Sequence, residues 1–138
     1  MKKLIMVIMA AFAFFSCESS NPKLVEFSQL PANAQSIIKT HFADKVISTI
    51  FYENDLFDKD YEVRFEDGSK IDFDGNGEWT NIEVKKNGGV PVGVIPSAIN
   101  SYVSSKHPNH YVIDIEKDCR EYNVELNNGI DMVFGKDR

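Results

Sequence analysis

The sequence predicts an α+β fold built from two tandem α-β-β-β repeats, with the helices packed on one face of an antiparallel sheet. The first observation is an internal repeat: Leu30-Pro31 and Ile95-Pro96 each open a helical pattern, 65 residues apart. The second is an alternation of apolar and polar residues that follows each helical pattern and is broken by glycine-bearing turns. Helices followed by antiparallel strands with one buried face define this fold class.

Each predicted helix begins at a proline, which is tolerated in a first helical turn because its missing N–H would be unpaired there. Apolar residues then follow at positions i, i+3 and i+4, which places them on one face of a helix of roughly ten to twelve residues. These residues are Ala34, Ile37 and Ile38 in the first copy and Ile99, Tyr102 and Val103 in the second.

Three strands are predicted after each helix. In each strand, alternate residues are expected to share the buried face. In the first copy these are Ile47, Thr49 and Phe51, then Tyr61, Val63 and Phe65, then Ile71 and Phe73. In the second copy they are Tyr111, Ile113 and Ile115, then Tyr122, Val124 and Leu126, then Met132 and Phe134. Asp67-Gly68 and Asn128-Gly129 mark the turns before the last of these strands. Only the first copy continues into a fourth strand, over residues 78–84.

The chain opens with the pattern of an export signal over residues 1–16. Two lysines precede twelve residues without a polar side chain and then Ser16. The apolar run is too short for a helix that crosses a ~30 Å hydrocarbon core, which needs about twenty residues. Cys17 follows at the boundary and predicts a lipid-anchored envelope protein, on the periplasmic or surface face of an outer membrane and held there by its lipid alone. The alternative is an ordinary secretory signal that leaves Cys17 as a stray thiol.

The rest of the chain divides into a lipid-proximal tether over residues 17–27, a first repeat over 28–84, a linker over 85–94 and a truncated second repeat over 95–138.

Two of the 15 basic residues lie in the signal, which leaves 13 basic against 21 acidic side chains and a formal net charge of −8. Such acidity argues against nucleic-acid binding and favours cationic partners. With Cys17 lipidated, Cys119 has no partner for a disulfide, and we interpret it as an unremarkable thiol in a tight turn.

The repeated motifs suggest a family. The pattern of a Leu-Pro helix, then Tyr61-x-Val63-x-Phe65, a glycine turn and residues 71–79 (Ile-Asp-Phe-Asp-Gly-Asn-Gly-Glu-Trp) resembles the PepSY-like proteins described as β-lactamase-inhibitor-like. The resemblance runs from about Leu30 to Phe134. It implies an exported protein of Bacteroides-type bacteria with a two-repeat inhibitor-like fold, and it implies no established activity. No motif here matches the contact residues of the inhibitors.

One segment matches the spacing of an EF-hand calcium loop. Asp72, Asp74, Asn76 and Glu83 stand where such a loop carries its oxygen ligands. An EF-hand needs a helix on each side, whereas strands flank this segment. We therefore expect a hairpin in which Gly75, Asn76 and Gly77 supply positive φ, with no metal bound and no calcium-dependent stabilisation. These four residues remain weak candidates for a calcium site outside the EF-hand class.

Other candidates for chemistry are few. His41, His107 and His110 are interpreted as solvated or loop histidines because no third ligand lies near them in sequence to complete a zinc site. No nucleophile elbow, phosphate loop or zincin motif occurs. We expect a protein that is not an enzyme and needs no cofactor.

An asymmetry between the copies points to a binding site. The offset is 65 at Leu30 and Ile95 but 61 at Tyr61 and Tyr122, so the first copy has four extra residues between its first two strands. They fall within residues 53–60, where Leu56 and Phe57 are flanked by Asp55 and Asp58. An apolar pair with an acidic rim is typical of a protein-binding anchor; alternatively, Phe57 folds back over the sheet edge. The sequence thus predicts a non-catalytic envelope lipoprotein that binds an envelope protein, with small-ligand or calcium binding as the alternative.

Overall fold

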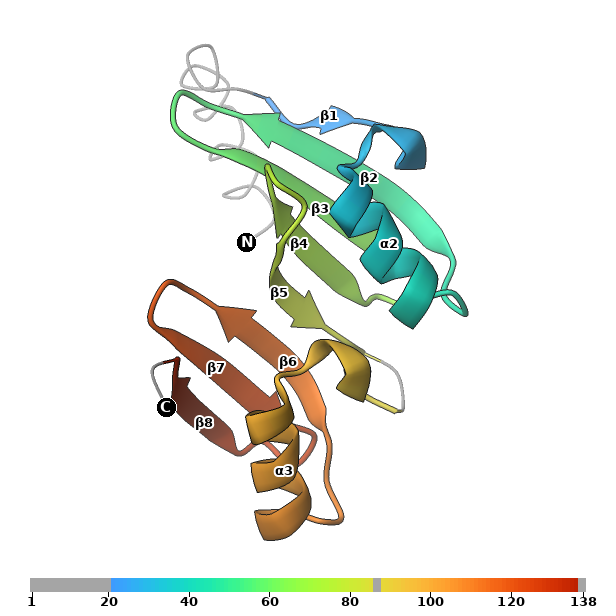
Figure 1. Ribbon diagram of the computed structural model, residues 1–138. Helices are drawn as coiled ribbons and strands as arrows, with labels where there is room; N and C mark the ends of the chain where they lie inside the picture. The colour runs from blue at the N-terminus through green and yellow to red at the C-terminus, as the bar shows by residue number, and fades with distance from the viewer. Residues whose placement is uncertain (1–20, 86–87, 137–138) are drawn as a thin grey trace, which may run out of the picture.

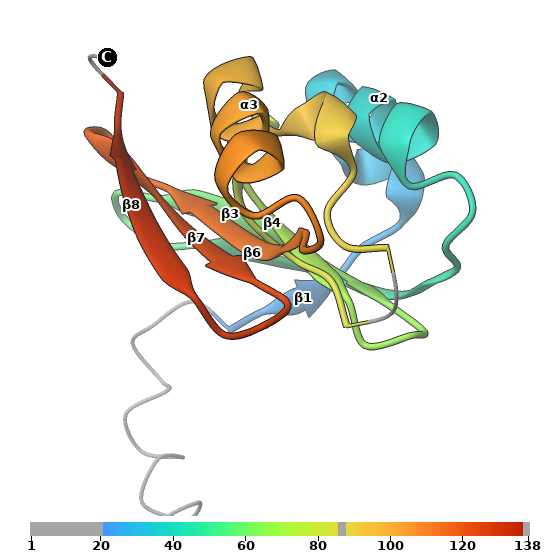
Figure 2. The same cartoon turned by 90° about the horizontal axis from the view of Figure 1, so that it is seen from below.

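The structure is a computed structural model that describes residues 21–85 and 88–136. Eight strands form one antiparallel sheet in chain order, and two helices lie on the same face of it (Figures 1 and 2). The helices are α2 (Ala32–His41) and α3 (Ser97–Lys106). The strands are β1 (Lys23–Leu24), β2 (Ile47–Asn54), β3 (Lys59–Phe65), β4 (Lys70–Asp74), β5 (Trp79–Glu83), β6 (Val112–Lys117), β7 (Glu121–Leu126) and β8 (Asp131–Gly135). The predicted α+β arrangement, with helices on one face of an antiparallel sheet, is confirmed. Within the described residues, neither helix is long and apolar enough to span a membrane.

The two halves of the chain share one core. Ala34 and Ile38 of α2, and Ile99 and Val103 of α3, are buried against the sheet as their spacing predicts. Strands β5 and β6 join the halves, where Ile82 pairs with Ile115 and neither is exposed to solvent. The buried side chains therefore form a single apolar cluster that continues across this joint.

A β-bulge changes which residues of β2 and β6 face the core. The pairing register shifts between Ile47 and Thr49 in β2, and between Val112 and Asp114 in β6, the positions 65 residues on. A bulge adds one residue to a strand and so inverts the alternation beyond it. Buried Ile50, not Phe51, thus faces the helices. Strict alternation was the wrong prediction for β2 and for β6, where Val112 is buried while Tyr111 and Ile113 are only half-buried.

The predicted tether and linker are shorter than the sequence indicated. Strand β1 lies inside the predicted tether and pairs with β2. Partly buried Val25 and Phe27 pack against the core beside it, which explains why this segment belongs to the fold. In the predicted linker, Val90 is buried and its N–H donates to the carbonyl of Val112 at 2.7 Å.

A short 3₁₀ turn precedes each helix. These turns are η1 (Phe27–Gln29) and η2 (Val92–Val94), again 65 residues apart. The side-chain amide of Gln35 in α2 donates to the carbonyl of Leu30 at 2.8 Å, and that of Asn100 in α3 donates to the carbonyl of Val92 at 2.9 Å. One amide in each helix therefore fixes the preceding turn against the start of that helix.

The four extra residues of the first copy lengthen a hairpin rather than its turn. Asn54 pairs with Lys59 across the β2–β3 turn, and Lys117 pairs with Tyr122 across the β6–β7 turn, so each turn holds four residues. Ile50–Val63 in the first copy and Ile115–Val124 in the second are equivalent pairs. The β2–β3 hairpin has two more residue pairs between this position and its turn than the β6–β7 hairpin has. The insertion therefore carries the turn of residues 55–58 farther out from the sheet.

Candidate functional site

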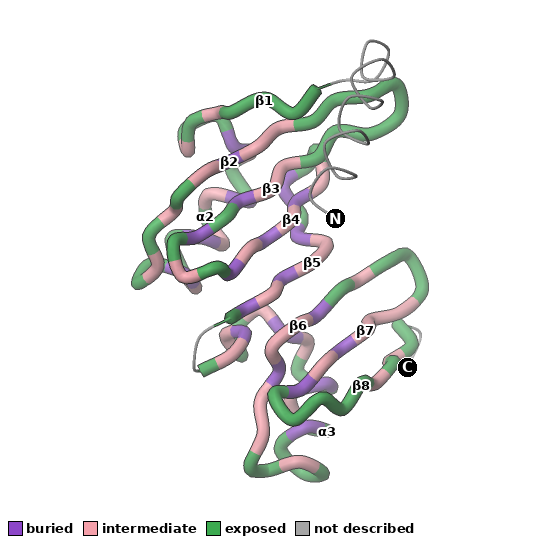
Figure 3. The backbone as a smooth tube through the Cα atoms, turned by 180° about the vertical axis from the view of Figure 1, so that it is seen from behind, coloured by how far each residue is buried: buried purple, intermediate pink, exposed green. Residues whose placement is uncertain are grey.

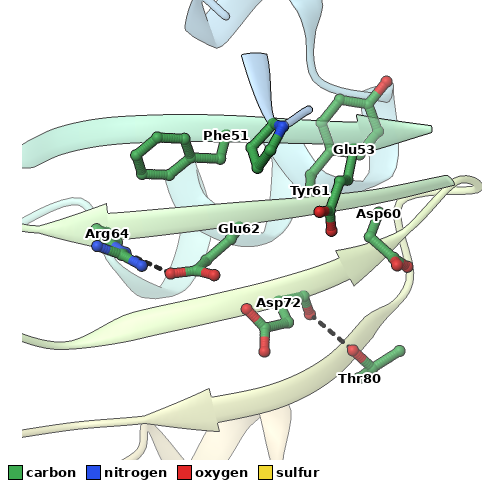
Figure 4. Close-up of a pocket in the computed structure, with 9 residues that line it drawn as sticks. Phe51, Glu53, Asp60, Tyr61, Glu62, Arg64, Asp72 and Thr80 are labelled. Atoms are coloured by element: carbon green, nitrogen blue, oxygen red, sulfur yellow. Dashed lines mark hydrogen bonds and ion pairs between the residues drawn. The ribbon is translucent and has the colours of Figure 1, made fainter. Parts of the chain in front are cut away.

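The face of the sheet opposite the helices is uncovered among the described residues (Figures 2 and 3). We call it the open face. Its strands alternate between core residues that point to the helices and polar residues that point to solvent. A first hollow of about 430 Å³ lies on the open face over β2 to β5 (Figure 4). It is lined by Pro22, Phe51, Glu53, Asp60, Tyr61, Glu62, Arg64, Asp72 and Thr80.

The charges in the first hollow are unevenly paired. Arg64 pairs with Glu62 and lies over the ring of Phe51, with the guanidinium carbon 5.0 Å from the ring centroid. Lys70 contacts Oδ2 of Asp72 at 3.2 Å. The other carboxylate oxygen of Asp72, Oδ1, is buried and has no hydrogen-bond partner in the described part of the chain. Burial raises the pKa of Asp72, and the Lys70 charge only partly opposes it.

A second hollow of about 560 Å³ continues the open face across the joint between the halves. Asp72 lines both hollows, so they adjoin. Asn81 of β5 donates to Oδ1 of Asp114 on β6 at 3.0 Å. Burial raises the pKa of Asp114 and neighbouring Glu83 adds to the rise, although the Asn81 hydrogen bond opposes it. The open face is thus a continuous acidic surface on which carboxylates repel one another.

The EF-hand-like segment forms the predicted β4–β5 hairpin. Oδ1 of Asp74 accepts the backbone N–H groups of Asn76 at 2.9 Å and Glu78 at 3.0 Å, so this carboxylate closes the turn. Glu83 pairs with Lys70, four residues from Asp74 along β4, or about 13 Å at ~3.3 Å per residue. These oxygens cannot converge on one ion. The prediction of positive φ at three residues was wrong for two of them, since Gly77 alone has it, with φ +85°.

The β2–β3 turn presents the predicted apolar pair to solvent. The side chains of Leu56 and Phe57 are each 91% exposed. Oδ1 of Asp55 accepts the N–H of Phe57 at 3.0 Å and of Asp58 at 2.9 Å, and these hydrogen bonds lower the pKa of Asp55. The side-chain carboxylate of Asp55 therefore closes the turn. Phe57 does not fold back over the sheet edge; what binds this pair stays a prediction.

The remaining candidates do not come together. His41 ends α2 and packs against Gly93, while His107 caps α3. Cys119 is an exposed free thiol in the β6–β7 turn. The described residues contain no group of three or more His, Cys, Asp or Glu side chains placed to hold a metal ion. Cys17 lies outside the described residues.

Sequence reasoning singled out Asp72 but missed the surface to which it belongs. Asp60 with Glu62, and Asp114 with Glu116, alternate with core positions, so their spacing already places each pair on one face of a strand. The alternation gave no indication that four strands bring these carboxylates side by side, because that depends on strand order.

Comparison with known proteins settles the family. The family model "Putative beta-lactamase-inhibitor-like, PepSY-like" matches residues 59–137, more than half of the chain. The chain belongs to this PepSY-like family. The resemblance that the motifs suggested is thereby confirmed. No curated protein matches the chain.

Three solved structures are similar to this PepSY-like protein. A "putative periplasmic protein" of the DUF2874 family from Bacteroides vulgatus is 40% identical, covers 85% of this chain and 91% of its own, and has a TM-score of 0.80. A "putative calcium-regulated periplasmic protein" from Bacteroides thetaiotaomicron is 37% identical over 84% of this chain and 91% of its own, with a TM-score of 0.79. A "putative periplasmic protein of unknown function", also from Bacteroides vulgatus, is 31% identical over 84% of this chain and 93% of its own, with a TM-score of 0.76. These relatives support an exported protein of the cell envelope.

Proposed function

We propose that this PepSY-like protein is a non-catalytic binding module of the envelope, and that it holds a lysine- or arginine-bearing segment of a partner protein on its open face. The observation that carries the proposal is the uncovered, hollowed sheet face with its surplus of carboxylates. Asp60 shows the surplus: burial and then the charges of Asp58, Glu53 and Asp55 raise its pKa. A partner's cations would relieve that repulsion.

Site-specific photo-crosslinking in the native bacterium tests the proposal. A photoreactive residue at Thr80, which lines the first hollow, should give one adduct of defined size. The same residue at exposed Ser105 on α3 is the control and should give none. A third site at Phe57 tests the predicted anchor in the β2–β3 turn. Adducts of equal yield at Thr80 and Ser105 would refute binding at the open face.

Charge reversal gives a second test on the identified partner. Glu116→Lys lies on the open face and is exposed, so it should weaken binding about tenfold or more, a loss of at least ~1.4 kcal/mol. Asp44→Lys, also exposed but between α2 and β2, makes the same charge change off the open face and should leave the affinity unchanged. Equal affinities for the two variants would argue against recognition by charge.

The lipid anchor at Cys17 is part of the proposal. Cys17→Ser should abolish labelling by radioactive fatty acid and move the mature protein into the soluble fraction, because a serine has no thiol to carry the lipid. Labelling that persists in this variant would exclude Cys17 as the acylated residue.

A second candidate function is calcium binding in the first hollow. It is favoured by the unpartnered Oδ1 of Asp72 and by the name of the Bacteroides thetaiotaomicron relative. A site with a Kd of about ten micromolar would stabilise the protein by ~2.7 kcal/mol at ~1 mM calcium and raise Tm by several degrees. Asp72→Asn should remove that rise, while Asp74→Asn, whose carboxylate closes a turn, should lower Tm equally with and without calcium. An unchanged Tm on addition of calcium to the unmodified chain would exclude this candidate. We expect residues 72–83 to give no stabilisation as an EF-hand-like loop.

A further inference from the structure

We propose that the β2–β3 turn contacts the lipid surface to which the chain is anchored, with Leu56 and Phe57 inserted among the lipid headgroups. The inference rests on the proposed lipid at Cys17 and adds a second, non-covalent membrane contact. It is independent of what the open face binds.

The path of the chain places the anchor beside this turn. Strand β1 runs antiparallel to β2, with Leu24 opposite Phe51 and Lys23 opposite Tyr52. In this direction the chain before Lys23 runs along β2 toward the turn, and Pro22 and Glu53 line the same hollow. Figure 1 shows the described chain beginning at the same end of the sheet as the β2–β3 turn.

The remaining distance to the anchor is short. Cys17 lies four positions before Asn21, the first described residue, so the two are joined by four Cα-to-Cα steps. A fully extended chain of that length spans at most about 14 Å. A lipid on Cys17 therefore holds the turn close to the bilayer, so insertion of its side chains becomes an intramolecular step at high effective concentration.

The turn has the chemistry that a lipid surface requires. Three of its backbone N–H groups donate within the turn: those of Phe57 and Asp58 to Asp55 Oδ1, and that of Asp55 to the carbonyl of Asp58 at 3.0 Å. Leu56 and Phe57 project fully from it, and the lengthened hairpin carries them outward. Apolar side chains at such a position bury their surface at the boundary between headgroups and acyl chains.

The second copy provides an internal comparison. Its β6–β7 turn has the same length and the same capping, with Asp118 Oδ1 accepting the N–H groups of Arg120 at 2.7 Å and Glu121 at 2.9 Å. Yet Cys119 and Arg120 stand where the first copy has Leu56 and Phe57. The apolar pair is therefore found at the turn that lies next to the anchored end.

The charges near the turn select the kind of lipid. Residues 53–60 carry four acidic side chains, Glu53, Asp55, Asp58 and Asp60, against one basic side chain, Lys59. This surplus is repelled by an anionic surface. The contact therefore suits a zwitterionic headgroup such as phosphatidylethanolamine or phosphatidylcholine.

An environment-sensitive thiol label tests the contact on the full lipidated chain, reconstituted into phosphatidylcholine vesicles. One sample carries the label at Leu56→Cys in a Cys119→Ser background. The matched control carries it on the native thiol of Cys119, at the equivalent place of the other turn. On vesicles, the label at 56 should shift to shorter emission wavelengths and become shielded from an aqueous quencher, and the label at 119 should do neither. Phe57→Asp, added to the first sample, should reverse the shift.

The outcomes separate this inference from the proposed function. The protein could sediment with the vesicles while the label at 56 stays as exposed to the quencher as the label at 119. That result would overturn the lipid contact and would not bear on the proposed function of the open face. Protein that does not sediment overturns the anchor and the contact together. The label at 56 could instead become shielded only when the partner protein identified by crosslinking is added, with or without vesicles. That result would overturn the lipid contact and assign the turn to protein binding.

Discussion

At the scale of single residues, exposure separates side chains that hold the fold from those free to bind. Leu126 is completely buried in the core, whereas Leu56 and Phe57 project from a turn. Both kinds are apolar in the sequence. Removing a buried side chain leaves a cavity, but truncating an exposed one leaves only water.

Leu56→Ala combined with Phe57→Ala should therefore change the free energy of unfolding by no more than about 0.5 kcal/mol. Leu126→Ala should lose about 2–5 kcal/mol. Urea unfolding of both variants measures the contrast. A loss of ~3 kcal/mol in the double variant would mean that the turn packs against the sheet in solution.

The carboxyls of the open face give the stability a defined pH dependence. The pKa values of Asp60, Asp72 and Asp114 are raised, chiefly by burial, so the folded state binds these protons more tightly than the unfolded state. The free energy of unfolding should therefore rise as pH falls from 7 through the raised pKa values. Asp72→Asn should reduce this rise, as urea midpoints between pH 7 and pH 5 would show.

Asp67 should reverse the trend in stronger acid. Burial alone would raise its pKa, but the hydrogen bonds from Lys45, at 2.6 Å, and from Ser69 outweigh burial and lower it to about 2. The stability that Asp67 contributes is present above its unfolded pKa of ~3.9 and is lost as pH falls toward 2. The loss of stability below pH 4 should be smaller in Asp67→Asn. Equal acid sensitivity in both proteins would exclude this cause.

At the scale of elements, turns fix how hairpins meet helices. Gly77 has a positive φ in the β4–β5 turn and lies against the start of α2, where an added Cβ would stand 2.8 Å from Pro31 Cβ and 3.0 Å from Ala34 N. Asn33 of α2 also donates to the carbonyl of Asn76 in this turn at 3.2 Å. The glycine is required for its conformation and for this close approach.

Gly77→Ala and Gly129→Ala separate these two causes. Gly129, in the β7–β8 turn, also has a positive φ, but an added Cβ would meet nothing within 4 Å. Gly129→Ala should lose about 1–2 kcal/mol from backbone strain alone. Gly77→Ala should lose clearly more, because the turn must also move away from α2. Equal losses in thermal or urea unfolding would show that the contact with α2 does not constrain the turn.

At the scale of the whole molecule, the β5–β6 pairing makes two halves into one cooperative unit. Ile82 and Ile115 pair at the centre of the joint, and the indole of Trp79 in the first half lies 6.4 Å from the Tyr122 ring of the second. The apolar cluster continues through these contacts. Neither half can expose this surface without cost.

Unfolding should accordingly be a single transition. Trp79 fluorescence, which reports the joint, and circular dichroism, which reports both halves, should give coincident curves. Ile115→Ala should shift both curves together by about 2–5 kcal/mol. Two separated transitions would mean that the halves unfold independently.

The sequence alone determined the elements and their class. Apolar spacing located both helices and most strands, because periodicity is a local property of the chain, and the duplicated motifs identified the family. Local patterns also located the β4–β5 hairpin, since Asp74 closes that turn with neighbours in sequence.

Only the tertiary structure decided what depends on pairing between distant segments. The bulges inverted the alternation of buried and exposed residues in β2 and β6. Strand β1 became part of the sheet by pairing with the edge of β2. Pairing also showed that the four extra residues extend a hairpin, and strand order gathered Asp60, Asp72 and Asp114 on one open face. Register and strand order are set by contacts between residues far apart in the chain, which no local window of sequence contains.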